Sequence, residues 1–183
     1  MEELIVFVNE AGVPTGETGP KLASHTSETK LHLAFSCYIF RKSDHKFLLT
    51  QRALTKKVWP GVWTNSVCGH PAPGEKIEDA IRRRADYELG IKNVTDISTL
   101  LPNYRYTTPP YNGIVENEFC PVYLAFIDEE FVPNPAEVEA CEWLTWTDYV
   151  AKLTDPANAE IMSYWAKDQY KQLGKLEQLR EFI

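Results

Sequence analysis

Runs of apolar residues along the chain predict a core that is built largely from β-strands. The strongest run covers residues 31–40, in which one face of an extended chain is wholly apolar while His32 lies on the other. Residues 58–70 form a further extended stretch that is bounded by glycine and proline. The other predicted strands span residues 4–8, 46–52, 98–107 and 114–127.

Helical periodicity is present in the middle of the chain and again in its last fifty residues, which are expected to be mostly helical. The central helix covers residues 76–89 and is closed by Gly90, a residue that commonly ends helices. Several strands, one central helix and helices at the end favour an α+β sandwich formed as a single domain over residues 1–183. The later helices are predicted over 146–153, about 157–172 and about 174–181.

The composition is that of an ordinary globular protein, with 44% hydrophobic and 25% charged residues. No apolar run approaches the ~18 residues that a membrane span requires. The short apolar run at residues 4–8 follows two glutamates rather than basic residues, which argues against a signal peptide. We therefore expect a cytoplasmic protein with no membrane partner, whose four cysteines are reduced thiols.

The charged residues are unevenly distributed along the chain. Nineteen basic and 26 acidic residues give a net charge of −7, which argues against a nucleic-acid partner. Nine of the acidic residues lie between Asp128 and Glu160, whereas basic residues gather between 41 and 57 and at 82–84. Local basic clusters in an acidic protein suit a small anionic ligand, although solvated strand ends and helix faces would also contain such residues.

Two charged residues interrupt the apolar face of the central helix. On a helical wheel for residues 76–89, Arg84 and Glu88 fall in the middle of the apolar stripe. Burial of these charges is unfavourable unless each is paired or binds a ligand. Two interpretations remain open: an ion pair between the two residues at the rim of the core, or a site where Glu88 holds a cation and Arg84 an anion.

Histidine and glutamate residues near the predicted strands suggest a metal site. Glu116 and Glu118 would lie on one face of a strand with Cα atoms about 6.5–7 Å apart, and buried paired carboxylates require a cation or a proton. Three imidazoles and two carboxylates would suit zinc or manganese, although buried histidines more often simply satisfy hydrogen bonds. Cys68, taken alone, is typical of a small core residue. The candidate ligands are His25, His32, His70, Glu116 and Glu118.

Most of a Nudix box spans the central helix and its flanks, at Gly69, Glu75, Arg83, Ala85, Glu88, Gly90 and Ile91. The chain therefore resembles the Nudix superfamily, which implies an α/β/α sandwich with a mixed β-sheet, followed here by a helical C-terminal segment. Arg84 and Tyr87 replace two glutamates with which Nudix hydrolases gather magnesium. The loss of these two glutamates argues against diphosphate hydrolysis and is compatible with diphosphate binding.

Longer motifs narrow the resemblance to one Nudix branch, the type 1 isopentenyl-diphosphate isomerases, in their bacterial form. Residues 59–63 lead into Thr-Asn-Ser-Val-Cys-Gly-His-Pro at 64–71, which is similar to the cysteine motif of that family. Ile-Val-Glu-Asn-Glu at 114–118 is similar to its glutamate motif. The resemblance implies an isomerase that interconverts isopentenyl and dimethylallyl diphosphate in isoprenoid biosynthesis, by adding and removing a proton through a carbocation.

The resemblance also implies roles for particular residues. Cys68 and Glu118 would be the two catalytic acid/base groups, on opposite faces of the substrate. One Mn²⁺ or Zn²⁺ would be held by His25, His32, His70, Glu116 and Glu118. A Mg²⁺ bound with the diphosphate would be held by Glu88 and the backbone carbonyl of Cys68. The substrate would contact Lys21, Arg52, Lys56 and Arg84 through its diphosphate and Trp165 through its hydrocarbon, and Tyr106 would hydrogen-bond Glu118.

Two other functions remain as alternatives, and the family resemblance favours a monomer. A Nudix pyrophosphohydrolase would fit the fold, but the reduced box and a catalytic-looking Cys68 count against it. A non-catalytic diphosphate-binding module would explain the reduced box. It would not require Cys68, two glutamates and three histidines to converge.

Overall fold

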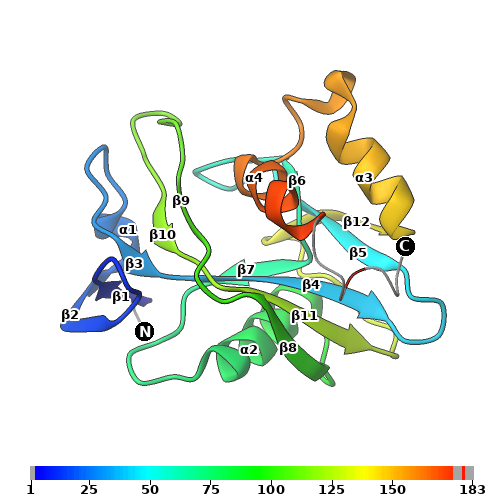
Figure 1. The fold of residues 1–183 in the computed structure, drawn as a ribbon, viewed down its shortest axis with the longest axis horizontal. Helices are drawn as coiled ribbons and strands as arrows, with labels where there is room; N and C mark the ends of the chain where they lie inside the picture. The colour runs from blue at the N-terminus through cyan, green and yellow to red at the C-terminus, as the bar shows by residue number, and fades with distance from the viewer. Residues whose placement is uncertain (1–2, 175–178, 180–183) are drawn as a thin grey trace.

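The larger of two mixed β-sheets lies at the centre of the fold (Figure 1). The structure, a computed structural model, describes residues 3–174 and 179. In order across this sheet, the strands are β12 (Val138–Leu144), β5 (Phe47–Arg52), β4 (Phe35–Arg41), β11 (Val122–Ile127) and β8 (Thr95–Leu101). β4 and β11 run parallel, whereas β5 and β8 pair with them in antiparallel fashion. Two short strands complete it: β6 (Trp63–Thr64) pairs with β5, and β7 (Val67–Gly69) pairs with β4.

The smaller sheet positions residues that the sequence marked as candidates. Its strands, in spatial order, are β2 (Pro14–Pro20), β1 (Leu4–Val8), β3 (His32–Leu33), β10 (Asn117–Phe119) and β9 (Arg105–Thr107). The register of β10 places Glu118 opposite His32 on one neighbouring strand and opposite Tyr106 on the other. Backbone pairing alone therefore brings a histidine and a tyrosine to the same carboxylate.

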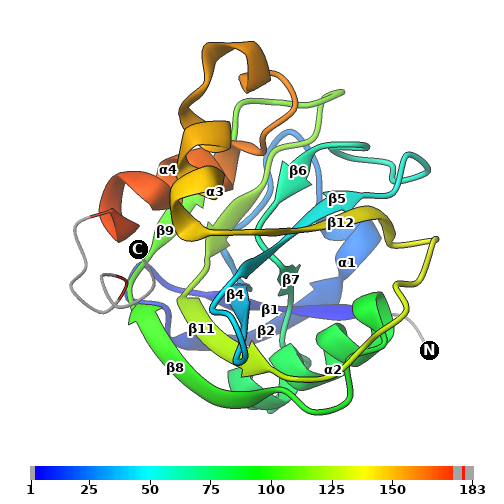
Figure 2. The same ribbon diagram turned by 90° about the vertical axis from the view of Figure 1, so that its right-hand side faces the viewer.

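Helices cover both faces of the larger sheet, as the two perpendicular views show (Figures 1 and 2). On one face, α2 (Ile77–Leu89) buries its apolar stripe against β4 and β5, and it ends at Gly90, whose φ of 72° is left-handed. On the other face, α3 (Trp146–Thr154) and α4 (Tyr164–Leu173) pack against an aromatic cluster. This arrangement confirms the predicted α+β sandwich. No helix among the described residues is long and apolar enough to cross a membrane.

Two predicted strands are each divided between the two sheets. The run at 31–40 breaks at Ala34 into β3 and β4, and the run at 114–127 breaks at Cys120–Pro121 into β10 and β11. The breaks lie side by side, because Ala34 donates its N–H to the carbonyl of Phe119 over 2.9 Å. Pro121 has no N–H with which to continue a ladder. At both of these neighbouring breaks the chain therefore passes from the smaller sheet into the larger one.

Other differences from the predicted elements involve segments with weak apolar patterning. The prediction of one strand over 98–107 is wrong, since a turn separates β8 from β9. The largely exposed strand β2 and the half-exposed edge strand β12 have no matching prediction, and β12 occupies part of the C-terminal region expected to be helical. The helix expected from about 157 begins only at Tyr164, behind the N-cap Ser163. The helix predicted over about 174–181 lies outside the described residues, apart from 174 and 179.

Candidate active site and metal centre

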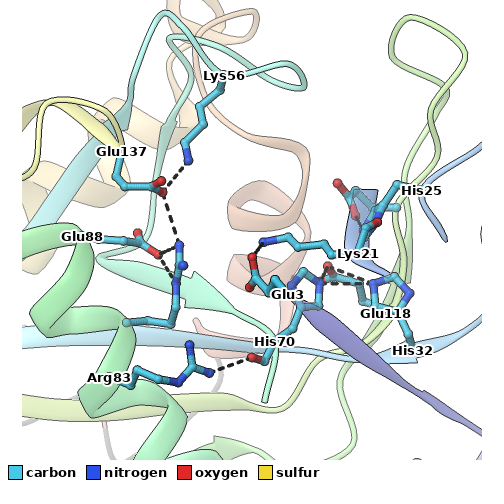
Figure 3. Close-up of polar contacts among 12 residues, drawn as sticks. Glu3, Lys21, His25, His32, Lys56, His70, Arg83, Glu88, Glu118 and Glu137 are labelled. Atoms are coloured by element: carbon cyan, nitrogen blue, oxygen red, sulfur yellow. Dashed lines mark hydrogen bonds and ion pairs between the residues drawn. The ribbon is translucent and has the colours of Figure 1, made fainter. Parts of the chain in front are cut away.

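Four of the predicted metal ligands converge where the two sheets meet (Figure 3). His25 follows the short helix α1 (Lys21–Ser24), His32 lies in β3, His70 follows β7, and Glu118 lies in β10. One ligand atom from each of the four residues lies within 4.8 Å of the others. Such a group of imidazole and carboxylate donors can hold a divalent metal ion.

The hydrogen bonds behind the histidines orient them for such a role. The Nδ1 atoms of His25 and His32 lie 2.5 and 2.9 Å from the carbonyls of Lys21 and Lys30, so each Nδ1 carries a proton. Each Nε2 is thereby left as the nitrogen that can bind a metal, as a metal-binding imidazole requires. The Nε2 atoms of His32 and His70 are 3.2 Å apart, and that of His70 lies 3.2 Å from Glu118 Oε1.

Glu116 lies at the rim of this centre rather than inside it. It precedes β10, so the prediction that it shares one strand face with Glu118 is wrong. Its Oε2 lies 3.1 Å from Nε2 of His25, through which it joins the cluster. Burial lowers the pKa of His25, but the hydrogen bond and charge of Glu116 outweigh burial and raise the pKa above its ordinary value.

Glu118 is held as a carboxylate. Burial alone would raise its pKa, but the hydrogen-bonding and electrostatic interactions with the His32 and His70 imidazoles outweigh burial and hold the pKa well below its usual range. Tyr106 donates its hydroxyl proton to Glu118 Oε2 over 2.8 Å, which confirms the contact implied by the resemblance. The carboxylate therefore has a fixed orientation and a lone pair that can accept a proton.

Cys68, in contrast, is held in its protonated form. It lies in β7 opposite Ser36 of β4, and its thiol donates to Oδ1 of Asn65 over 3.0 Å. Burial raises the pKa of this thiol to about 12, so it is protonated at neutral pH. Cys68 and Glu118 both line one cavity of about 230 Å³.

A polar network beneath Cys68 includes residues that the sequence analysis missed. Asn65 is fully buried, and its Oδ1 accepts hydrogen bonds from the Thr64 hydroxyl over 2.7 Å and from the Cys68 thiol. The indole N–H of Trp165 donates to the Thr64 hydroxyl over 2.6 Å, which fixes this ring in the cavity wall. The only signal for Asn65 in the sequence is its place three residues before Cys68 in the cysteine motif.

The four cations expected to bind a diphosphate line the same cavity, and each already has partners. Arg52 donates to the carbonyls of Val58 and Trp59, each over 3.1 Å. The other three pair with carboxylates: Lys21 with Glu3 at 3.0 Å, Lys56 with Glu137, and Arg84 with Glu88 and Glu137 at 2.8 and 3.3 Å. Glu3 and Glu137 had not been singled out from the sequence.

The pairing of Arg84 with Glu88 confirms the first of the two interpretations of the helix. Both side chains are about nine-tenths buried, at 11% and 13% exposure, although they face a cavity rather than the apolar core. Burial raises the pKa of Glu88, while the neighbouring Arg84 charge works to lower it. The ion pair does not exclude ligand binding, because both side chains line the cavity.

The burial of His70 is expected to make the metal-free protein sensitive to acid. Burial is the main reason that the pKa of His70 is lowered to about 4, whereas an unfolded histidine titrates near 6.5. Because the unfolded chain binds the proton more tightly, stability is retained above pH 6.5 and falls as the pH drops toward 4. From pH 7 to 4.5 the loss from this group amounts to about 2–3 kcal/mol in the free energy of unfolding.

Urea denaturation at both pH values, with a chelator present, measures this loss. His70→Gln is the matched variant, since it keeps a polar side chain without the titrating imidazole. The variant should lose less stability than the unaltered protein on acidification. An equal loss in both proteins would contradict the assignment to His70.

Comparison with known proteins shows which family this chain is similar to. Residues 30–165 match the NUDIX domain family. The isopentenyl-diphosphate Delta-isomerase of Paenarthrobacter aurescens is 52% identical over 143 residues, covering 78% of this chain and 76% of the relative. The protein of the same name from Salmonella arizonae is 44% identical, covering 99% of this chain and 97% of the relative.

Solved structures support the fold at lower sequence identity. A Deinococcus radiodurans protein superposes with a TM-score of 0.69 at 20% identity, over 93% of this chain and 99% of that one. A MutT protein from Methanosarcina mazei gives a TM-score of 0.56 at 14% identity, over 80% and 96% of the two chains. At these identities the likeness concerns the fold alone, and it confirms the predicted Nudix-type sandwich.

Proposed function

The chain belongs to the isopentenyl-diphosphate Delta-isomerase family of NUDIX-domain proteins, and from this premise we propose that it interconverts isopentenyl and dimethylallyl diphosphate. The observation that carries the proposal is the pairing of Cys68 with Glu118 in one cavity. One is a protonated thiol and the other an ionised carboxylate. The site therefore contains both a proton donor and a proton acceptor.

The reaction requires both groups. To move the double bond, a proton is added at one carbon and another is removed from a carbon two bonds away. Each transfer needs an acid/base group within hydrogen-bond reach of its carbon. Cys68 and Glu118 serve the two carbons from opposite faces of the substrate. A hydrolase would have no use for the Cys68 thiol, and a simple binding module would need neither group.

Aromatic side chains around the cavity suit the carbocation that forms between the two proton transfers. Water would quench this cation, so the pocket must exclude it. The indole of Trp165 is 5% exposed and lies beside Tyr106, with ring centroids 6.3 Å apart. An aromatic face can stabilise a desolvated cation by about 2 kcal/mol. The hydrogen bond from the indole to Thr64 keeps that face in place.

The histidine and glutamate cluster binds one divalent metal ion, Mn²⁺ or Zn²⁺. The ligands in this proposal are His25, His32, His70, Glu116 and Glu118. When bound, the ion supplies positive charge that fixes the orientation and tunes the proton affinity of Glu118. The carbonyls of Lys21 and Lys30 keep two of the imidazoles in the tautomer that such binding requires.

The basic wall of the cavity binds the diphosphate without cleaving it. Lys21, Arg52, Lys56 and Arg84 present cationic donors, which form strong hydrogen bonds with phosphate oxygens. Glu88, together with the carbonyl of Cys68, holds a Mg²⁺ that accompanies the diphosphate, since Mg²⁺ prefers oxygen ligands. Arg84 and Tyr87 stand where Nudix hydrolases have glutamates, so the wall grips an anion rather than activating water.

Phosphorus and proton NMR of isopentenyl diphosphate, incubated with the protein, Mg²⁺ and Mn²⁺ or Zn²⁺, tests the proposal. We expect dimethylallyl diphosphate to accumulate while the diphosphate stays intact. Release of phosphate without isomerisation would instead establish the hydrolase. Binding without either reaction would leave the non-catalytic module.

A further inference from the structure

Glu137 is rigidly held at the edge of the basic wall. It precedes β12, and its carbonyl accepts a hydrogen bond from the N–H of Ala53 over 2.9 Å. Its own N–H donates to the carbonyl of Asn134, and Asn134 N–H donates to the carbonyl of Glu88, each over 2.9 Å. The backbone of Glu137 is thus tied to the end of α2 and to the residue after Arg52. Its carboxylate pairs with Lys56 and Arg84 but has no part in the proposed acid/base chemistry.

The side chain of Glu137 connects two of the cations that bind the diphosphate (Figure 3). Its Oε2 forms an ion pair with Lys56 Nζ and lies 3.3 Å from Nη2 of Arg84. Arg84 in turn pairs with Glu88. The result is a row of alternating charges along the cavity, Lys56, Glu137, Arg84 and Glu88, in which the Glu137 side chain is 13% exposed.

The charge balance of this wall leaves little positive charge for an anion. Four cations face three carboxylates, Glu3, Glu88 and Glu137, so one positive charge remains in excess. Lys57 also borders the cavity, but it is exposed and solvent and salt screen its charge. A single phosphate group already carries about −1.5 to −2 at neutral pH, and a diphosphate carries more. Diphosphate bound alone would therefore leave the wall negative.

We propose that Glu137 makes diphosphate binding depend on a divalent cation. The carboxylate takes up positive charge from Lys56 and Arg84 that the phosphate oxygens would otherwise use. It also places a second carboxylate beside Arg84, which already pairs with Glu88. Two neighbouring carboxylates suit a hard cation such as Mg²⁺. Diphosphate therefore binds well when it arrives with the cation and poorly without it. The inference rests on the proposed function, because it assumes that this wall binds the diphosphate of the substrate.

If Glu137 only held Lys56 and Arg84 in position, its replacement would have the opposite effect on cation-free diphosphate binding. Loss of the carboxylate would then disorder Lys56 and Arg84 and weaken diphosphate binding with or without the cation. Under our proposal, Glu137→Gln removes a negative charge from an anion site and tightens cation-free binding. The direction of the change in cation-free affinity separates the two roles.

Calorimetric titration with isopentyl diphosphate, a substrate analogue without the double bond, measures this affinity with and without Mg²⁺. The full chain is used, with the histidine and glutamate centre loaded identically throughout. The quantity of interest is the ratio of the two dissociation constants, which gives the gain in affinity due to Mg²⁺. In Glu137→Gln we expect this gain to fall by about tenfold, through tighter binding in the absence of Mg²⁺.

Two further variants control the experiment. Glu139→Gln removes an equal charge from an exposed position two residues away, in β12, and should leave the gain unchanged. Glu137→Asp keeps the charge and should retain most of the gain, even if the shorter side chain alters stability. An unchanged gain in Glu137→Gln, or weaker cation-free binding, would overturn the inference. Failure of the unaltered protein to bind the analogue would instead overturn the proposed function.

Discussion

Replacing Cys68 with alanine is expected to reduce turnover of isopentenyl diphosphate by roughly a thousandfold or more, since it removes one of the two proposed acid/base groups. The proposed diphosphate contacts are made by other residues of the cavity lining and should remain intact. The dissociation constant of isopentyl diphosphate should therefore stay within about threefold of its original value. Steady-state kinetics and calorimetry measure the two quantities on the same preparation.

A matched thiol provides the control for this experiment. Cys141 in β12 is half-buried and does not line the cavity, so Cys141→Ala should keep normal turnover. Turnover by Cys68→Ala at the rate of the unaltered protein would show that the thiol is not the acid/base group.

Replacing Glu118 with glutamine is expected to abolish turnover and also to weaken metal binding. Glutamine has nearly the same shape, but it carries no charge and does not accept a proton as a carboxylate does. The buried carboxylate is shared by His32, His70 and Tyr106, so its loss affects both the acid/base step and the metal centre. Metal affinity should fall by more than the roughly 10–100-fold that loss of an outer-shell partner typically causes.

Metal titration and steady-state kinetics of Glu118→Gln measure the two effects separately. Glu142→Gln is the control, because this glutamate pairs with Lys152 away from the cavity. If Glu118→Gln binds metal normally but is inactive, the residue acts only in proton transfer. If it keeps full activity, its assignment as an acid/base group is wrong.

The parts of the site that could be predicted depend on local patterns. A helical wheel places Arg84 and Glu88 in an apolar stripe because helix geometry fixes side-chain direction from sequence spacing. The buried strand with His32 follows in the same way from alternation of side chains. Both patterns are local, and the structure confirms both.

Residues that act through distant contacts could not be found in this way. Glu137 contacts Lys56 and Arg84 across 81 and 53 positions of sequence, and it lies just before an edge strand with little apolar patterning. The apolar pattern predicts one strand that includes both Glu116 and Glu118, but the strand starts one residue after Glu116 and leaves it beside His25. Such contacts depend on sheet register and tertiary packing, which a single sequence does not encode locally.

Deuterium exchange tests the central claim of this account most directly. Isopentenyl diphosphate is incubated in deuterated water with the protein, Mg²⁺ and the loaded histidine and glutamate centre, and proton NMR follows each carbon. The account predicts that dimethylallyl diphosphate forms with deuterium in its methyl positions and that deuterium enters the methylene position of the recovered substrate. No deuterium at either position, on protein shown to contain its metal, would contradict acid/base isomerisation by Cys68 and Glu118.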